Sequence, residues 1–300
     1  MAFSNQRTEI YTYDRMTEDL QALQQQYPDL VTLDSLTDTP DGRKLWHMTI
    51  GREGADRHIF VNAAIHGREY VTSWLVMEQA KAFLQECRQS PELLPEDLAL
   101  HLVPMINPDG VSISQLGMEG CLKPQTKALV EEILERECEG SQEEFLKRWK
   151  SNAQGIDLNR NFDAMWEEYE DGVGAPSADH YKGEAPGCAP EAAALIKLTE
   201  TWNFERTLSY HAQGSVIYWN FGQTGELKDK TMALAQEISE ATGYGLDGDF
   251  SLLDPAGYKD WAITKKGIPS LTVEVGRETA PVPQSQYETI WQENKDVWRS

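Results

Sequence analysis

The chain alternates between short apolar runs and longer segments in which apolar residues recur at helical spacing. The short runs predict buried strands at 58–65, 100–106, 207–211, 216–219 and 271–275. The helical spacing predicts helices at 17–27, 72–87, 190–198 and 227–241. Strands that alternate with helices, some of them apolar on both faces, are typical of a sheet covered by helices. The pattern therefore predicts an α/β fold.

Two further stretches refine this pattern. Residues 107–110, Asn-Pro-Asp-Gly, predict a turn after the second apolar run. Residues 131–144 are rich in Glu and poor in apolar residues, which favours a solvated helical face over an acidic docking site. No repeat and no linker rich in Gly, Ser or Pro divides the sequence. We therefore expect a single domain over residues 1–300.

The composition narrows the class of protein. The 300 residues include 27 Lys+Arg and 49 Asp+Glu, which gives a formal net charge of −22, and 40% of them are hydrophobic. An apolar fraction of this size is typical of a globular protein. The acidic balance argues against nucleic-acid partners, whose phosphates need Lys and Arg, and against docking on an anionic membrane surface.

The N-terminus and the cysteines predict a location. The first nine residues are polar and lack the apolar run of a signal peptide, and no window approaches the roughly 18 consecutive apolar residues of a membrane span. Cys87, Cys121, Cys138 and Cys188 form no Cys-x-x-Cys pair, which argues against a Cys-rich zinc site. We expect free thiols in a cytoplasmic protein. The alternative is a disulfide in a protein exported by another route.

The first candidate for chemistry is the pair His66 and Glu69, at the end of an apolar run. Imidazole and carboxylate are both zinc ligands, and at this spacing they can converge on one ion. The alternative is a surface salt bridge. A third ligand must come from elsewhere, and His211 follows a predicted strand, where open α/β sheets form their crevices. Taken alone, His211 fits a histidine of the core better.

Two other stretches carry side chains suited to binding or catalysis. Asn159 and Arg160 offer amides and a guanidinium fork that suit a carboxylate or a developing oxyanion, although an Asx-type turn with a structural Arg explains them equally well. Glu274 interrupts a β-branched run, where a carboxylate is costly unless it is paired, near a metal or shifted in pKa. This suggests a general base, unless Glu274 faces water at a strand edge.

Taken together, these motifs resemble the zinc carboxypeptidases of the carboxypeptidase A type. The resemblance extends from about Tyr11 to the C-terminus, and it is carried by His66-x-x-Glu69, the 107–110 turn, Asn159-Arg160, His211 and Glu274, in that order. Residues 209–219 and 274–283 are similar to one branch, the bacterial γ-D-glutamyl-L-diamino acid endopeptidases, which cut cell-wall peptides before diaminopimelate. The resemblance implies a single three-layer α/β/α domain with a mixed, mainly eight-stranded twisted sheet.

The resemblance also implies a zinc site. It implies one Zn²⁺ per chain, held by His66, Glu69 and His211. Glu274 matches the general base of the family. Asp157 matches an acid that orients the first His ligand, which is physically sensible because a metal-bound His usually donates its other N–H to a carboxylate.

Substrate-binding positions follow from the same resemblance. Arg68, Asn159 and Arg160 match the residues that bind the terminal carboxylate of the substrate. The digestive enzymes have an Arg for the oxyanion where this chain has Lys150, which keeps the charge but loses the fork geometry. We assign Lys150 to the oxyanion, with Arg148 as the alternative.

Two positions depart from the digestive enzymes. The mobile tyrosine of the lid falls on Leu252, and Tyr258 is a possible replacement. The base of the side-chain pocket is Lys259, where the digestive enzymes carry an apolar or acidic residue. A lysine there favours an acidic group on the incoming side chain. That fits diaminopimelate, whose side chain ends in an amino group and a carboxylate, and it fits Glu or Asp equally well.

The resulting prediction is a zinc-dependent peptidase that hydrolyses an amide beside a free carboxylate in γ-D-Glu–diaminopimelate peptides from the cell wall. One alternative is a carboxypeptidase that releases acidic C-terminal residues from ordinary peptides. The other is a catalytically silent binding module on the same fold. In each case Arg68, Lys150, Arg160 and Lys259 predict a basic pocket within an acidic protein.

Overall fold

One mixed sheet forms the framework of the protein. The computed structural model describes residues 10–52, 54–249 and 254–299. Its strands are β1 Val31–Asp38, β2 Lys44–Gly51, β3 Arg57–Ala63, β4 Leu98–Val103, β5 Phe204–His211, β6 Val216–Tyr218, β7 Gly245–Asp247 and β8 Ser270–Glu274. They form a sheet in the order β1-β2-β4-β3-β5-β8-β6-β7. The predicted eight-stranded mixed sheet is confirmed.

The centre of the sheet is parallel, and an antiparallel pair flanks it on each side. Strands β4, β3, β5 and β8 are parallel neighbours, whereas β2 runs antiparallel to β4 and β6 runs antiparallel to β8. Strands β5 and β6 follow each other along the chain, yet they are not neighbours in the sheet, because β8 lies between them. Parallel strands bring their carboxyl ends to one edge of the sheet.

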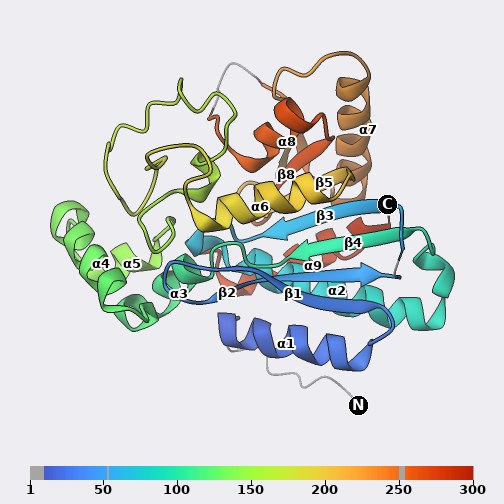
Figure 1. Cartoon of the computed structure of the whole chain (residues 1–300), viewed down its shortest axis with the longest axis horizontal. Helices are drawn as coiled ribbons and strands as arrows, with labels where there is room; N and C mark the ends of the chain where they lie inside the picture. The colour runs from blue at the N-terminus through green and yellow to red at the C-terminus, as the bar shows by residue number, and fades with distance from the viewer. Residues whose placement is uncertain (1–9, 53, 250–253, 300) are drawn as a thin grey trace.

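Helices cover both faces of the sheet (Figure 1). They are α1 Tyr13–Gln26, α2 Val71–Gln89, α3 Pro108–Leu116, α4 Pro124–Glu137, α5 Gln142–Lys147, α6 Pro190–Thr201, α7 Gly225–Thr242, α8 Tyr258–Lys266 and α9 Tyr287–Asn294. Helices α1, α2, α7 and α9 pack on one face, and α6 and α8 pack on the other. The three-layer α/β/α prediction is confirmed. Helices α4 and α5 lie at the end of the molecule away from α7.

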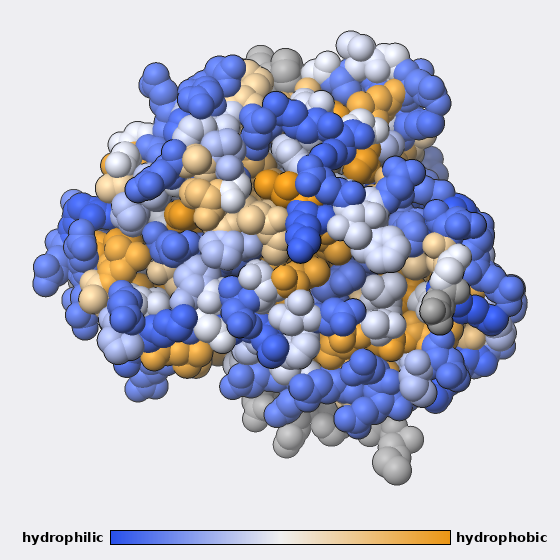
Figure 2. Space-filling model, in the orientation of Figure 1, coloured by the Kyte–Doolittle hydropathy of each residue, from blue (hydrophilic) through white to orange (hydrophobic). Residues whose placement is uncertain are grey.

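Alternation along the central strands supplies both cores. On β3, Ile59 and Val61 join the core under α2, whereas Phe60 joins the core under α6 and α8. Because each face is apolar, both sides of the sheet exclude water. The outer surface is different: hydrophilic side chains dominate the face seen in Figure 2, with apolar residues scattered among them.

Local chemistry explains where the predicted element boundaries were wrong. Helix α1 begins at Tyr13 rather than near Thr17, because the side chain of Thr12 accepts a hydrogen bond from the backbone N–H of Arg15. The 107–110 stretch does more than turn the chain: Asn107 caps the N–H of Gly110 and opens α3. The Glu-rich segment 131–144 spans the second half of α4 and the first half of α5, with its Glu side chains largely exposed.

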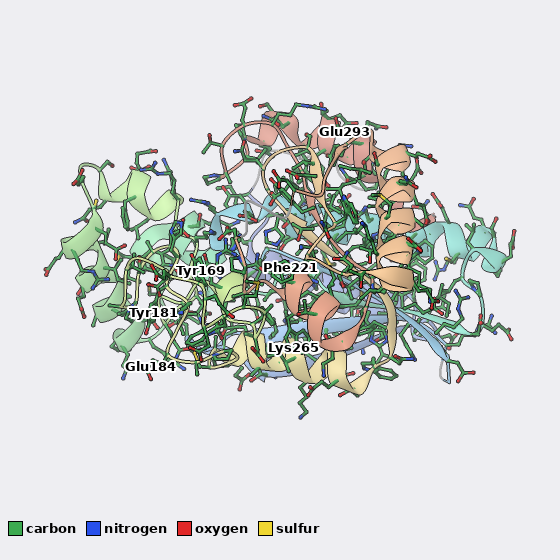
Figure 3. The ribbon with its side chains drawn as sticks, turned by 90° about the horizontal axis from the view of Figure 1, so that it is seen from above. Tyr169, Tyr181, Glu184, Phe221, Lys265 and Glu293 are labelled. Carbon is green, nitrogen blue, oxygen red and sulfur yellow. The ribbon has the colours of Figure 1, made fainter. Side chains whose placement is uncertain are left out.

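A long connection without helix or strand covers residues 161–189. Seen from above, Tyr169, Tyr181 and Glu184 of this connection lie on the side of the molecule away from α7 (Figure 3). Phe221, which follows β6, lies between the connection and α7 in the same view. Within the described part of the chain, no helix has the length and apolarity needed to cross a membrane.

Candidate active site

The predicted site residues meet at the carboxyl ends of three adjacent parallel strands. His66 follows the end of β3, His211 is the last residue of β5, and Glu274 is the last residue of β8. His211 and Glu274 are register partners across β5 and β8. Parallel pairing therefore brings together side chains that lie more than 200 positions apart in the sequence.

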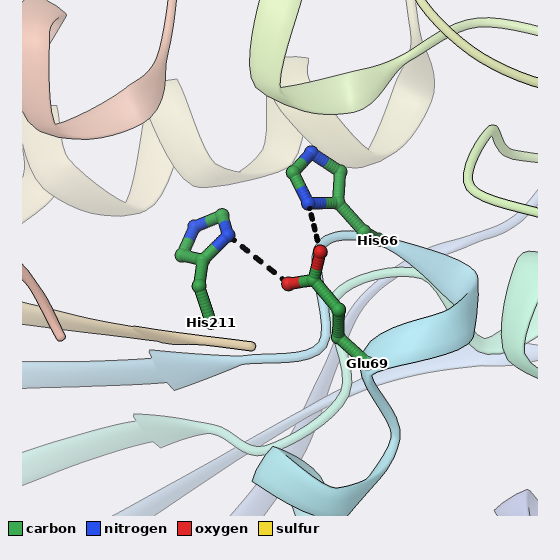
Figure 4. A group of neighbouring side chains, drawn as sticks. All are labelled: His66, Glu69 and His211. Atoms are coloured by element: carbon green, nitrogen blue, oxygen red, sulfur yellow. Dashed lines mark hydrogen bonds and ion pairs between the residues drawn. The ribbon is translucent and has the colours of Figure 1, made fainter. Parts of the chain in front are cut away.

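His66, Glu69 and His211 form a buried cluster (Figure 4). The Nδ1 atom of His66 lies 2.7 Å from Oε1 of Glu69, and Nδ1 of His211 lies 3.1 Å from Oε2 of the same carboxylate. All three potential ligand atoms lie within 4.8 Å of one another. The short helical turn Gly67–Glu69 carries Glu69 back beneath His66. Two imidazoles and a carboxylate, with room for water, match the ligand set of a catalytic zinc.

The tautomer of His66 indicates that a cation fits among these three side chains. Nε2 of His66 lies 3.2 Å from Oδ1 of Asp157, and it donates its proton there because a carboxylate only accepts. In the neutral ring, Nδ1 then presents a lone pair to Glu69 at 2.7 Å. Two facing acceptors repel unless a proton or a cation lies between them. A divalent cation among these atoms satisfies all three residues at once.

The charges of the cluster are interdependent. Burial alone would raise the pKa of Glu69, but His66 and His211 hold it well below its usual value. Burial would likewise lower the pKa of His66, but Glu69 and Asp157 raise it above its usual value. The cluster thus provides the concentrated negative potential that a metal ion requires.

Glu274 is a buried carboxylate beside this cluster. Burial raises its pKa to about 8, against the opposing effect of His211. Its Oε2 atom is buried and accepts no hydrogen bond from the described residues. Glu274 therefore faces the cavity rather than water at a strand edge. A bound divalent cation would lower its pKa again.

Lys150 lies behind the cluster rather than free in the cavity. Its Nζ is 3.1 Å from Oδ2 of Asp157 and 3.0 Å from Oδ1 of Asp179. Burial alone would lower the pKa of the amine, but the two carboxylates raise it above its usual value. The segment is fixed to the metal-ligand loop, because Gly67 N–H donates to the Lys150 carbonyl at 2.9 Å. Lys150 thus keeps its charge beside the cavity.

The predicted carboxylate-binding residues also line the cavity, each already held by the protein. Asp254 forms a hydrogen bond and an ion pair with the guanidinium of Arg160. Asn159 accepts a hydrogen bond from the backbone N–H of Tyr258 at 3.1 Å, which ties it to the start of α8. Arg68 lies 3.7 Å from Asp179. The arrangement positions two guanidinium groups and an amide at one cavity.

The cavity has a volume of about 540 Å³ and carries charges of both signs. Its cations are Arg68, Arg148, Lys150, Arg160 and Lys259. Its acidic residues, apart from Glu69, are Asp247, Asp249, Asp254, Asp260 and Glu274. The expectation of a basic pocket was therefore wrong. Pairs of opposite charge line this site, as expected where burial makes an isolated charge costly.

Lys259 illustrates this pairing. Its Nζ lies 2.5 Å from Oδ1 of Asp260, and both side chains are almost fully buried. The other oxygen of Asp260 accepts from the N–H of Gly257 and caps α8. The cavity therefore offers an ammonium group and a carboxylate side by side. From the sequence, Lys259 was assigned to the side-chain pocket but Asp260 was not.

The suggested replacement for the lid tyrosine was wrong. Tyr258 is buried in the core beneath α6, and its hydroxyl lies 2.9 Å from that of Thr199. Leu252, the other position considered, lies outside the described residues. Tyr218 lines the cavity from the end of β6 and is 40% exposed. The alternating pattern of β6 placed Tyr218 on a strand but gave no sign that it faces the site.

Asp179 is a second residue that the sequence analysis missed. It contacts Lys150, Arg68 and His180, so it links three basic side chains at one side of the cavity. It lies in the long connection 161–189, where no periodicity indicates which side chains turn inward. The adjacent His180 was the one local hint of a polar cluster.

Comparisons with known proteins agree with this geometry. The family model of zinc carboxypeptidases matches residues 16–297. The chain is 33% identical over 294 residues to γ-D-glutamyl-L-diamino acid endopeptidase 1 of Lysinibacillus sphaericus, which covers 94% of this chain and 70% of that protein. It is 24% identical to carboxypeptidase B of Astacus astacus over 87% of this chain and 84% of the relative.

Solved structures show the same fold. Bovine thrombin-activatable fibrinolysis inhibitor, in complex with tick carboxypeptidase inhibitor, superposes with a TM-score of 0.77 at 17% identity. The superposition covers 98% of this chain and 96% of the other.

Proposed function

Because this chain belongs to the zinc carboxypeptidase family, whose members are peptidases that use one zinc ion, we propose that it hydrolyses the γ-D-Glu–diaminopimelate bond of cell-wall peptides. One observation carries the choice of substrate: the Lys259–Asp260 pair in the cavity. The 33% identity to a γ-D-glutamyl-L-diamino acid endopeptidase supports the same choice.

The zinc ligands in this proposal are His66, Glu69 and His211, with Asp157 orienting His66. The convergence of their atoms within 4.8 Å supports the ligand set, and the bond from His66 Nε2 to Asp157 supports the tautomer. When bound, zinc supplies a Lewis acid that activates water and polarises the amide carbonyl. The remaining chemistry belongs to side chains of the protein.

Glu274 is the proposed general base and acid. Its carboxylate is within the cavity and has one oxygen without a hydrogen bond from the described residues, so it can take a proton from the attacking water and return it to the leaving amine. Lys150 keeps its positive charge beside the cluster and stabilises the oxyanion that develops on the carbonyl. Its two carboxylate partners hold the ammonium group in place.

Arg160, with Asn159 and Arg68, anchors the α-carboxylate of the residue being released. A guanidinium and an amide hold a carboxylate in a fixed plane, which sets the register of the scissile bond. Asp254 forms an ion pair with Arg160, and the substrate carboxylate would take its place. Exchange of one carboxylate for another keeps Arg160 paired throughout.

The Lys259–Asp260 pair is suited to a side chain that carries both charges. The far end of diaminopimelate has a carboxylate for Lys259 and an ammonium group for Asp260. A Glu or Asp side chain would pair with Lys259 but leave Asp260 facing a second carboxylate. Release of acidic C-terminal residues from ordinary peptides, as in a carboxypeptidase, remains the second candidate because Lys259 favours it. A catalytically silent module would have no use for the unpaired oxygen of Glu274.

A comparison of four peptides tests the substrate. We expect L-Ala-γ-D-Glu-meso-diaminopimelate to be cleaved with a kcat/KM about 10–100-fold above that of the same peptide ending in L-Lys, because the latter brings its ammonium group close to Lys259 without a carboxylate to offset the repulsion. The third peptide ends in L-Glu after γ-D-Glu, and the fourth is an ordinary α-linked peptide ending in Glu. Lys259→Asp should move preference from the diaminopimelate peptide to the Lys peptide.

Two outcomes would contradict the proposal. Faster release of Glu from the α-linked peptide than of diaminopimelate would favour the carboxypeptidase alternative. Unchanged kcat/KM ratios in Lys259→Asp would remove Lys259 from substrate selection.

We place this activity in the cytoplasm as part of the same proposal. The four cysteines are free thiols, which suits a reducing compartment. Immunodetection after cell fractionation tests the location, and recovery mainly from the culture medium or the cell envelope would contradict it.

A further inference from the structure

A second cavity adjoins the active site. It also measures about 540 Å³, and it shares Arg68 and Arg148 with the first cavity, so the two meet at these side chains. Its other basic residues are Arg136 and His180. A chain with 49 acidic and 27 basic residues thus gathers three guanidinium groups beside its catalytic cavity. Such a concentration favours an anionic ligand.

The protein already pairs most of these cations. Arg68 and His180 contact Asp179, and Arg136 contacts Glu132 and Glu137. In the catalytic cavity, Lys150, Arg160 and Lys259 contact Asp157, Asp254 and Asp260. Arg148 is the exception: within the described ranges, no carboxylate pairs with its guanidinium. Its charge is available to a ligand.

The backbone holds Arg148 in a defined place. It ends α5, with its N–H donating to the Phe145 carbonyl at 3.1 Å. The next residue, Trp149, is fully buried, and Lys150 is tied to the metal-ligand loop through Gly67. Arg68 in turn donates to the Arg148 carbonyl. An exposed guanidinium on an anchored backbone can reach a substrate without a large loss of order.

We infer that Arg148 binds the α-carboxylate of the D-Glu residue on the acyl side of the scissile bond. This inference rests on the proposed function and adds a specificity residue to it. In a γ-glutamyl linkage this carboxylate is separated from the scissile carbonyl only by Cα, Cβ and Cγ. In an α-linked peptide this position carries a charge only when the acyl residue is itself acidic. Arg148 therefore favours γ-D-Glu over uncharged acyl residues, whereas Lys259 and Asp260 distinguish the released residue.

One substrate pair isolates this contact. L-Ala-γ-D-Glu-meso-diaminopimelate is compared with the same peptide whose D-Glu α-carboxylate is amidated, D-isoglutamine. The two differ in a single charge on the acyl side. We expect wild-type kcat/KM to be about 10–100-fold higher for the carboxylate peptide, as for one charged hydrogen bond.

The same pair is then measured with three variants. Arg148→Gln should reduce hydrolysis of the carboxylate peptide to the level of the amidated one, with little change for the amidated peptide. Arg148→Lys should keep part of the preference. Lys147→Gln is the matched control, because it removes a neighbouring exposed charge that pairs with Glu143 and Glu144, and it should keep the full preference.

The outcomes separate this inference from the proposed function. The inference is wrong if the wild-type enzyme cleaves both peptides equally, or if Arg148→Gln slows both to the same extent. In either case Arg148 does not bind the D-Glu α-carboxylate, but the proposed γ-glutamyl activity is not contradicted. An equal loss would instead assign Arg148 to the oxyanion. If neither peptide is cleaved while an α-linked peptide is, the proposed function fails and the inference fails with it.

Discussion

Two groups of buried histidines lie on the same sheet in opposite electrostatic surroundings. His66 and His211 converge on Glu69 at the carboxyl ends of β3 and β5. His47, His58 and His101 form a row across β2, β3 and β4, with His101 3.0 Å from a nitrogen of each neighbour. We call these the metal cluster and the histidine row. They include five of the six histidines of the chain.

The partners of each group decide its charge. Carboxylates raise the pKa of His66 despite complete burial. In the row, burial lowers the pKa of His47 to about 4 and that of His101 to about 3, and no carboxylate forms an ion pair with either ring in the described chain. Trp202 lies over the row, 4.6 Å from the ring of His58 and 4.7 Å from that of His101. The row is neutral and structural, whereas the cluster is built to hold a cation.

The largest expected effect is a difference in bound zinc between variants of the two histidine groups. His211→Ala should abolish zinc binding and turnover, because it leaves only two ligands. His101→Ala, the matched change in the row, should keep one zinc per folded chain. Elemental analysis of purified protein measures both. Zinc loss in both variants, or in neither, would remove the distinction.

The next largest effect concerns Glu274, the proposed acid-base group beside the cluster. Glu274→Gln should keep zinc and lower kcat by at least about 10²–10⁴-fold, the usual contribution of a positioned acid or base. The side chain keeps its shape but can no longer take a proton. A kcat close to that of the wild type, with full zinc occupancy, would exclude Glu274 from proton transfer.

A third effect belongs to the histidine row. A histidine whose folded pKa lies below its unfolded value of 6.5 takes up its proton on unfolding, so the free energy of unfolding falls as pH drops below 6.5 and continues to fall until about pH 4. The shift of His47 alone corresponds to about 3 kcal/mol. Asp34 near His47, and Asp56 and Glu205 near His58, oppose the effect.

Urea unfolding of the zinc-loaded protein between pH 7 and 4 measures this loss. His47→Gln should flatten the profile, since an amide does not titrate in this range. His180→Gln, at an exposed position, is the control and should leave the slope unchanged. An identical slope in His47→Gln would assign the acid sensitivity to other groups.

The smallest expected effect concerns Glu191, a buried carboxyl group, and the free energy of unfolding. Burial raises the pKa of Glu191 to about 8, and its Oε1 has no hydrogen-bond partner among the described residues. Because the unfolded chain ionises from about pH 4.5, stability is lost as pH rises from 4.5 to 8. Glu191→Gln should therefore raise the free energy of unfolding by about 1–3 kcal/mol at pH 8. A lower stability in the variant at pH 8 would contradict this.

The strands that carry much of the site were predictable because runs of apolar residues indicate buried strands. The apolar runs before His66, around His211 and before Glu274 predicted strands, and the ends of adjacent parallel strands share one edge. The family motifs then supplied the ligand set. Edge strand β1 escaped prediction because most of its side chains are exposed or half-buried, so its hydrophobic pattern is weak.

The sequence by itself determined the α/β class, the order of the central elements along the chain and the candidate residues for the chemistry, since these depend on short-range periodicity and on residue type. Only the tertiary structure decided which charges meet. Lys150 faces Asp179, Lys259 faces Asp260, Tyr258 is buried away from the cavity, and no carboxylate of the described residues pairs with the guanidinium of Arg148. Such pairing depends on contacts between segments far apart in the chain and on how deeply each charged group is buried. The spacing of residues in the sequence predicts neither of these.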